Sequence, residues 1–176
     1  MSNFQYEEEA IAAHDQAIKL SPNDAWTRLQ KAITLRDFKR EEEAITIHDQ
    51  AIALKPDDAW YYTEKAITLR RLGRYEDAVA THDHAIELSN DAWHYTEKAI
   101  TLRVAKRFSD ALAAHDHAVQ LNPNDAWTHL QKAVTLRDAK KFEDAIAAHD
   151  RAIALKPDDA WYYTEKAVSL RAWRNG

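Results

Sequence analysis

The sequence predicts an all-α fold of repeated antiparallel helix pairs. An Asp-Ala-Trp triplet occurs five times, and each copy leads into Lys-Ala, then Ile or Val, then Thr or Ser, then Leu-Arg. Successive tryptophans lie 34, 33, 34 and 34 residues apart, and a period of about 34 residues is typical of helical repeat arrays. Residues 1–176 are therefore predicted to form a single repeat domain, in which each unit packs on its neighbours.

Helical periodicity and breaking residues define the individual elements. Ala10, His14 and Ala17 recur at the spacing of one helical face. Pro22 cannot continue that helix, and Asp24 occupies the N-cap position of the next one. The same cycle predicts ten helices with short connections, as antiparallel neighbours require. They cover residues 6–20, 25–38, 41–54, 60–72, 75–88, 92–105, 109–121, 126–139, 142–155 and 160–172.

One linker differs from the others, and a longer repeat overlies the short one. The linker 89–91 lacks the proline of the other four, which gives the single 33-residue interval. Residues 21–74 closely resemble residues 122–174 at an offset of 101 positions, three units less the missing residue. Recent duplication and deliberate construction would each explain this similarity.

Composition excludes several classes of function. The chain has no cysteine, only two glycines and a net charge of −5, which disfavours thiolate chemistry, phosphate-binding loops and binding to nucleic acid. The apolar runs are far shorter than the ~20 residues of a transmembrane helix. The N-terminus has no basic or apolar stretch of the kind found in signal peptides. We expect a cytoplasmic protein without nucleic-acid or membrane partners.

In its repeat length and helix pattern the chain resembles the tetratricopeptide repeat family along nearly its whole length. The family signature is Trp-x2-Leu-Gly-x2-Tyr, followed by Ala-x3-Phe, a small residue and a proline. The small residues, a leucine, the prolines and the turn 72–75 fit this signature, whereas lysine, alanine and histidine replace its leucine, glycine and phenylalanine. In the second full unit the signature positions hold Tyr62, Lys65, Ala66, Leu69, Ala78, His82 and Ala85.

The resemblance implies an architecture and a mode of action. The helix pairs would form a right-handed superhelical solenoid, with the first helix of each pair lining a concave groove and the second lying outside. The function implied is that of a protein-interaction scaffold that binds a peptide or partner segment in the groove. The resemblance implies no enzymatic activity, no cofactor and no metal.

Two rows of side chains on the first helices are the candidate binding residues. Tryptophan and arginine are enriched in binding hot spots, and an excess of lysine and arginine on these helices favours a ligand with acidic or carboxylate groups. In the alternative interpretation, the tryptophans pack between repeats and the arginines pair with Glu64, Glu97 and Glu165. The candidate partner-binding set is Trp26, Arg36, Trp60, Glu64, Arg70, Trp93, Glu97, Arg103, Trp127, Arg137, Trp161 and Arg171.

Five His-Asp pairs, beginning at His14, His48, His82, His115 and His149, invite a metal or catalytic interpretation. Packed helix axes lie about 8–10 Å apart, whereas a metal ligand must approach to about 2 Å. Adjacent residues on a helix point about 100° apart, and no serine recurs near the pairs to serve as a nucleophile. We expect each histidine to fill the family's aromatic position, with one ring nitrogen hydrogen-bonded.

The chain starts on a second helix and ends on a first helix. Residues 160–172 of one molecule could therefore pack on residues 6–20 of the next, in a head-to-tail contact that need not close. This gives an alternative to the scaffold: a structural or idealised array without a dedicated ligand, self-associating through its two end helices.

Overall fold

The chain is all-α across residues 3–175, the part that this computed structural model describes, with side chains from residue 5 onward. The predicted helical repeat fold, with ten helices over these residues, is confirmed. The helices are α1 (Asn3–Leu20), α2 (Ala25–Asp37), α3 (Glu41–Leu54), α4 (Ala59–Arg71), α5 (Tyr75–Leu88), α6 (Ala92–Val104), α7 (Phe108–Leu121), α8 (Ala126–Asp138), α9 (Phe142–Leu155) and α10 (Ala160–Asn175).

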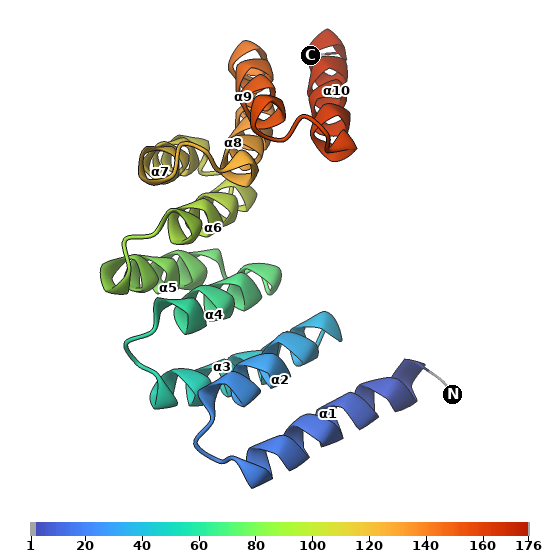
Figure 1. Ribbon diagram of the computed structural model, residues 1–176, viewed down its shortest axis with the longest axis vertical. Helices are drawn as coiled ribbons and strands as arrows, with labels where there is room; N and C mark the ends of the chain where they lie inside the picture. Colours follow the sequence, from blue (N-terminus) through green and yellow to red (C-terminus); the bar gives the residue numbers. More distant parts are fainter. Residues whose placement is uncertain (1–2, 176) are drawn as a thin grey trace. The chain divides into compact units, whose positions relative to one another are not determined.

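The helices form two compact units, Met1–Ser89 and Asn90–Gly176. Within each unit, successive helices pack as antiparallel neighbours (Figure 1). The first helices also contact one another, α2 with α4 in one unit, and α6 with α8 and α8 with α10 in the other. Within each unit no second helix contacts another second helix among the described residues. The first helices therefore form a layer of their own in each unit, and the organisation into one repeat domain stays a prediction.

Aspartate caps begin the first helices, as predicted. The Asp58 carboxylate accepts a hydrogen bond from the Trp60 backbone N–H at 3.1 Å, and Asp91 does the same for Trp93 at 2.8 Å. Such caps satisfy amides that have no partner inside the helix and are worth about 1 kcal/mol each. The cap also fixes the helix start relative to each tryptophan, which places all five tryptophans at the same helical position.

A tight turn closes the first helices at their C-terminal ends. At the end of α2 the Arg40 N–H donates to the Leu35 carbonyl at 2.9 Å, and the Lys39 N–H donates to the Arg36 carbonyl at 3.1 Å. This pair of bonds is a Schellman motif, which needs a residue in the left-handed region. That residue is Gly73 after α4, with φ 78°, but it is a lysine at positions 39, 106 and 140, with φ between 61° and 65°.

The terminal helices are longer than predicted. The first was expected to begin at residue 6 but begins at Asn3, and the last was expected to end at residue 172 but ends at Asn175. Neither segment contains a proline or an internal glycine, so nothing in the local sequence ends either helix at the predicted residue. The remaining ends agree to within one residue, with Ala59 and Phe108 beginning α4 and α7, while residues 38, 72, 105 and 139 act as C-caps.

The core consists of small and branched apolar side chains at helix crossings. In the first unit Ala66, Leu69 and Ala78 pack together between α4 and α5, and Ile45 of α3 joins them. In the second, Leu130 and Ala152 pack with Tyr162 of α10. The alanines are fully buried, so the helix backbones approach closely. Even one added methylene at these positions would disturb the packing.

The left-handed turn residues generate a reciprocal test. Replacing Gly73 with lysine should lower the free energy of unfolding by about 1 kcal/mol, because a side chain in this conformation costs roughly 1–2 kcal/mol. A Cβ at Gly73 would meet no atom within 4 Å, so the cost is one of backbone conformation alone. The matched change Lys39→Gly should raise stability by a similar amount. Urea unfolding followed by circular dichroism measures both, and the same sign for the two variants would contradict this account of the turn.

Candidate functional site

The five tryptophans lie at the N-terminal ends of the first helices, and three of them are strongly exposed. Trp26 is 55 % exposed, Trp60 42 % and Trp161 45 %, while Trp93 and Trp127 are half-buried. The rings of Trp127 and Trp161 stack with centroids 5.7 Å apart, which links α8 to α10. An aromatic ring can pack through one side and still present the other to a ligand, so the two interpretations of the tryptophan row are compatible.

The arginine row lies at the opposite ends of these helices and is tied to neighbouring carboxylates. Arg36 donates from Nη1 to Glu64 Oε2 at 2.8 Å, and both side chains are nearly buried. Arg137 donates to Glu165 at 3.1 Å, and Arg103 donates to Asp138 at 2.9 Å. The expected arginine–glutamate pairs thus occur between neighbouring first helices at both Glu64 and Glu165. Arg103 uses an aspartate because Gln131 occupies the corresponding position on α8.

The other members of the candidate set show the same division between buried and exposed groups. Glu97 is buried on α6, and Arg70 is half-buried on α4. Arg171 is exposed on α10 and has no carboxylate within ion-pair distance among residues 3–175. The structure therefore places the candidate tryptophans and arginines on the same helices but at opposite ends. Most of the arginine charge is compensated locally.

The histidines of the His-Asp pairs occupy one position in each second helix, which is buried in α3, α5, α7 and α9 and half-buried in α1. Nε2 of His48 lies 3.0 Å from Thr68 Oγ1, and Nε2 of His115 lies 3.0 Å from Thr135 Oγ1. His14 and His149 make the same contact with Thr34 and Ser169. The expectation that one ring nitrogen is hydrogen-bonded is confirmed for these four histidines.

The hydrogen-bond network fixes the protonation of the histidine rings. The Thr68 hydroxyl donates its only hydrogen to the Glu64 carbonyl at 3.1 Å, so its oxygen must accept from an Nε2–H of His48. The Nδ1 of His48 is buried without a partner among the described residues, as it also is in His115, and burial favours the neutral ring, in which this nitrogen is an acceptor. Burial lowers the pKa of His48 and His115 to about 3, and the nearby charges of Arg36 and Arg103 add to the effect.

The aspartates of these pairs face away from their histidines, as their sequence spacing predicts. Asp49 accepts from Lys65 at 2.6 Å, and Asp116 accepts from Lys132 at 2.6 Å. Each histidine and its neighbouring aspartate thus bind different side chains of the following first helix. The arrangement provides neither a catalytic dyad nor, among the described residues, a group of three metal-ligating side chains.

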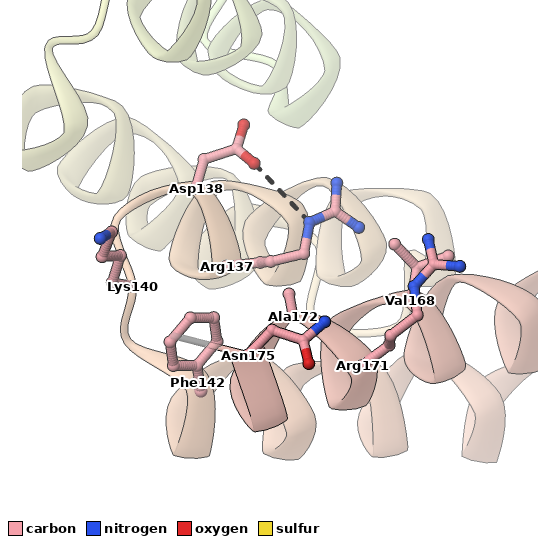
Figure 2. A pocket seen from close by; sticks show the side chains of 8 residues that line it. All are labelled: Arg137, Asp138, Lys140, Phe142, Val168, Arg171, Ala172 and Asn175. Carbon is pink, nitrogen blue, oxygen red and sulfur yellow. Dashed lines mark ion pairs between the residues drawn. The ribbon is translucent and has the colours of Figure 1, made fainter.

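A pocket of about 520 Å³ opens between α8, α9 and α10 (Figure 2). Arg137, Asp138, Lys140 and Arg171 supply charged groups to its lining, and Phe142 and Val168 supply apolar ones. The sequence analysis named Arg137 and Arg171 but missed the pocket and Lys140. The signal was present in the sequence, since Ala172 stands where the preceding repeat has Asp138.

Comparison with known proteins gives a direct match to one repeat unit. Residues 49–80 match a family model described as tetratricopeptide repeat. The chain thus contains at least one tetratricopeptide repeat. The resemblance seen in the sequence is thereby confirmed, and a comparison with curated proteins finds no match.

Several solved tetratricopeptide structures share the fold. TTC0263, a thermophilic TPR protein of Thermus thermophilus, superposes with a TM-score of 0.79 at 17 % identity, covering 95 % of this chain and 92 % of its own. MamA of Desulfovibrio magneticus RS-1 gives 0.71 at 18 % identity, covering 87 % of each chain. YrrB, described as a TPR protein with an unusual peptide-binding site, gives 0.62 at 20 % identity, covering 93 % of this chain and 84 % of its own.

No helix in the described part of the chain is long and apolar enough to cross a membrane.

The buried histidines make stability depend on pH. Their folded-state pKa lies below the unfolded value of 6.5, so the stabilisation is complete above pH 6.5 and is lost as pH falls toward about 3. In that window each deeply buried imidazole should lower the free energy of unfolding by about 1.4 kcal/mol for each pH unit of acidification, because only the unfolded chain takes up a proton at this ring. The melting temperature should therefore fall between pH 7.5 and pH 5.5.

The variant His48→Gln is a matched control for this effect. Glutamine keeps an N–H donor for Thr68 but does not titrate, so the slope of stability against pH should decrease by about 1.4 kcal/mol per pH unit. The comparison uses slopes and does not depend on the stability of the variant at any one pH. Identical slopes for the variant and the parent chain would refute the assignment.

Proposed function

We propose that this chain is a protein-interaction scaffold that binds an extended segment of a partner along its first-helix layers. The observation that carries the proposal is the regular row of exposed tryptophans, with Trp26, Trp60 and Trp161 each more than two-fifths exposed. Large aromatic side chains are costly to leave in water, and tryptophan is the residue most enriched in binding hot spots. YrrB, with its peptide-binding site, shows that a similar fold can serve this purpose.

The ligand proposed carries carboxylate groups. Arg36 uses one N–H toward Glu64, and a guanidinium has five donors in total, so a second carboxylate can share the same fork. At the tryptophan end, by contrast, the capping aspartates Asp24, Asp58 and Asp159 hold negative charge. A bound segment would place apolar side chains on the tryptophans and acidic groups toward the arginine end.

This function requires no catalysis. The histidines are buried and neutral, and their neighbouring aspartates are paired with lysines. We propose that the chain acts by binding alone, in a concave groove of the kind the family forms, and the cytoplasmic location stays a prediction.

Tryptophan variants test the proposal better than arginine variants. Removing Arg36 would leave Glu64 buried and unpaired, which typically costs about 3–5 kcal/mol of stability and would obscure any effect on binding. We expect Trp26→Ala and Trp60→Ala together, both in the first unit, to weaken binding of a peptide, selected with the whole chain from a displayed random library, by about 30-fold. Isothermal titration calorimetry measures the change.

The control removes an exposed apolar residue from a second helix. Tyr6 of α1 is 55 % exposed, so Tyr6→Ala should leave the affinity unchanged. If the tryptophan variant binds the selected peptide as tightly as the parent chain, the first-helix layer is not the binding surface.

A second candidate function is self-association through the end helices. On α10 the side chains Tyr163 and Leu170 are 49 % and 44 % exposed, whereas Leu69 and Leu136, which correspond to Leu170 in α4 and α8, are buried beneath the second helix that follows them. The α1 helix of another copy could supply such a second helix, since its Ala10 corresponds to the fully buried Ala44 and Ala78.

Sedimentation velocity tests this candidate. The parent chain should form larger species as its concentration rises, and Leu170→Glu should return it to a monomer, since a charge cannot be buried in an apolar contact without a large cost. Leu121→Glu on α7 is the matched control and should not change the distribution. A monomeric parent chain at all concentrations would eliminate the head-to-tail array.

A further inference from the structure

One position in the repeat carries a carboxylate on α8 and none on α10. Asp138 lies eleven residues after Trp127, and Ala172 lies eleven residues after Trp161. On α8 the carboxylate of Asp138 accepts a hydrogen bond from Arg103 of the preceding first helix at 2.9 Å. On α10 the methyl group of Ala172 offers Arg137 no such acceptor.

The pocket between α8, α9 and α10 lies at this missing carboxylate. In Figure 2 the side chains of Arg137 and Arg171 extend from α8 and α10, and Ala172 is drawn between them. Lys140, in the turn between α8 and α9, adds a third cation to the lining. The space of about 520 Å³ is large enough for one amino-acid residue of a ligand.

The charges around the pocket do not balance. Asp138 is shared between Arg103 at 2.9 Å and Arg137 at 3.6 Å, and Glu165 is bound by Arg137. Arg171 and Lys140 have no carboxylate within ion-pair distance in the described part of the chain. The lining thus holds three cationic groups, those of Arg137, Lys140 and Arg171, and one carboxylate, that of Asp138, and this excess favours an anionic occupant.

The rest of the lining favours a carboxylate attached to a small apolar group. Phe142, Val168 and Ala172 provide an apolar wall beside the cations, and the Asn175 amide adds a polar group. Guanidinium groups bind carboxylates through paired, parallel N–H donors, which gives direction as well as attraction. A freely hydrated inorganic anion would gain nothing from the apolar wall.

We infer that this pocket binds a carboxylate of the partner segment beside Ala172, at a repeat position where α2 and α8 carry an aspartate of their own. The inference rests on the proposed scaffold function and identifies one anchoring subsite for it. The carboxylate can come from the C-terminus of the partner or from an acidic side chain, and both present the same chemistry to Arg137 and Arg171.

The test uses small probes and the side-chain Nε–H signals of Arg137 and Arg171 in NMR spectra of the whole chain. Addition of N-acetyl-alanine, which has a free terminal carboxylate, or of N-acetyl-glutamic acid α-amide, which has a side-chain carboxylate, should shift both signals saturably. The probe that binds more tightly identifies whether the ligand carboxylate comes from a C-terminus or from an acidic side chain. N-acetyl-alanine amide should shift neither, and shifts produced equally by inorganic phosphate would overturn the inference in favour of unselective anion binding.

Ala172→Asp is the decisive variant, because Asp138 shows that the repeat accommodates an aspartate at this position. The added carboxylate should occupy the pocket and weaken probe binding at least tenfold. Ala172→Asn, which adds the same volume without charge, should bind the probes within about twofold of the parent chain. Equal binding by all three proteins would show that the carboxylate does not lie beside residue 172.

The outcomes separate the pocket from the scaffold. If the library-selected peptide binds through Trp26 and Trp60 but no carboxylate probe moves the arginine signals, the pocket assignment is wrong and the scaffold stands. If the probes bind in an Ala172-dependent manner but the tryptophan variants leave peptide affinity unchanged, the pocket assignment stands. The tryptophan row is then not the surface that binds the peptide.

Discussion

Each compact unit depends on a recurring hydrogen bond between a second helix and the first helix that follows it in the same unit. In four repeats a histidine Nε2 lies 2.9–3.0 Å from a Thr or Ser hydroxyl twenty residues later. Since repeats contact only their neighbours, this contact must recur at the successive helix junctions within a unit to hold that unit together. A histidine here gains a directional bond that the family's usual phenylalanine could not make, at the cost of an unpaired Nδ1 and sensitivity to acid.

This junction also determines which side of each first helix is available for binding. The threonine that meets His48 and the lysine that meets Asp49 lie on the side of α4 that packs against α3. The tryptophan and arginine positions lie on other sides of the helix, where only contacts between neighbouring first helices compete for them. Arg36 is occupied by such a contact, a nearly buried ion pair with Glu64. Trp26, Trp60 and Trp161, by contrast, are largely exposed to solvent.

Features that recur in every repeat could be predicted from the sequence, and features specific to one repeat could not. The 34-residue period, the aspartate caps and the hydrogen-bonded histidine follow from local rules that apply equally at each copy. The ends at Asn3 and Asn175 were misjudged because the repeat pattern places a boundary there, whereas residues 3–5 and 173–175 contain no proline or glycine to break the helix. The pocket beside Ala172 was missed because it depends on a side chain that is absent, and its detection required the position of Arg103 against Asp138.

The substitutions on α8 show how such an array acquires a specific site without changing its fold. Gln131 replaces the glutamate that would pair with Arg103, and Asp138 supplies the charge about two helical turns further along. The ion pair between neighbouring first helices is thereby kept, but its carboxylate is moved toward the arginine end of the layer. On α10 the glutamate has returned as Glu165 while the aspartate is lost. A change of one side chain per repeat thus redistributes charge along the layer, and specificity for a ligand can arise there independently of the buried histidine junctions.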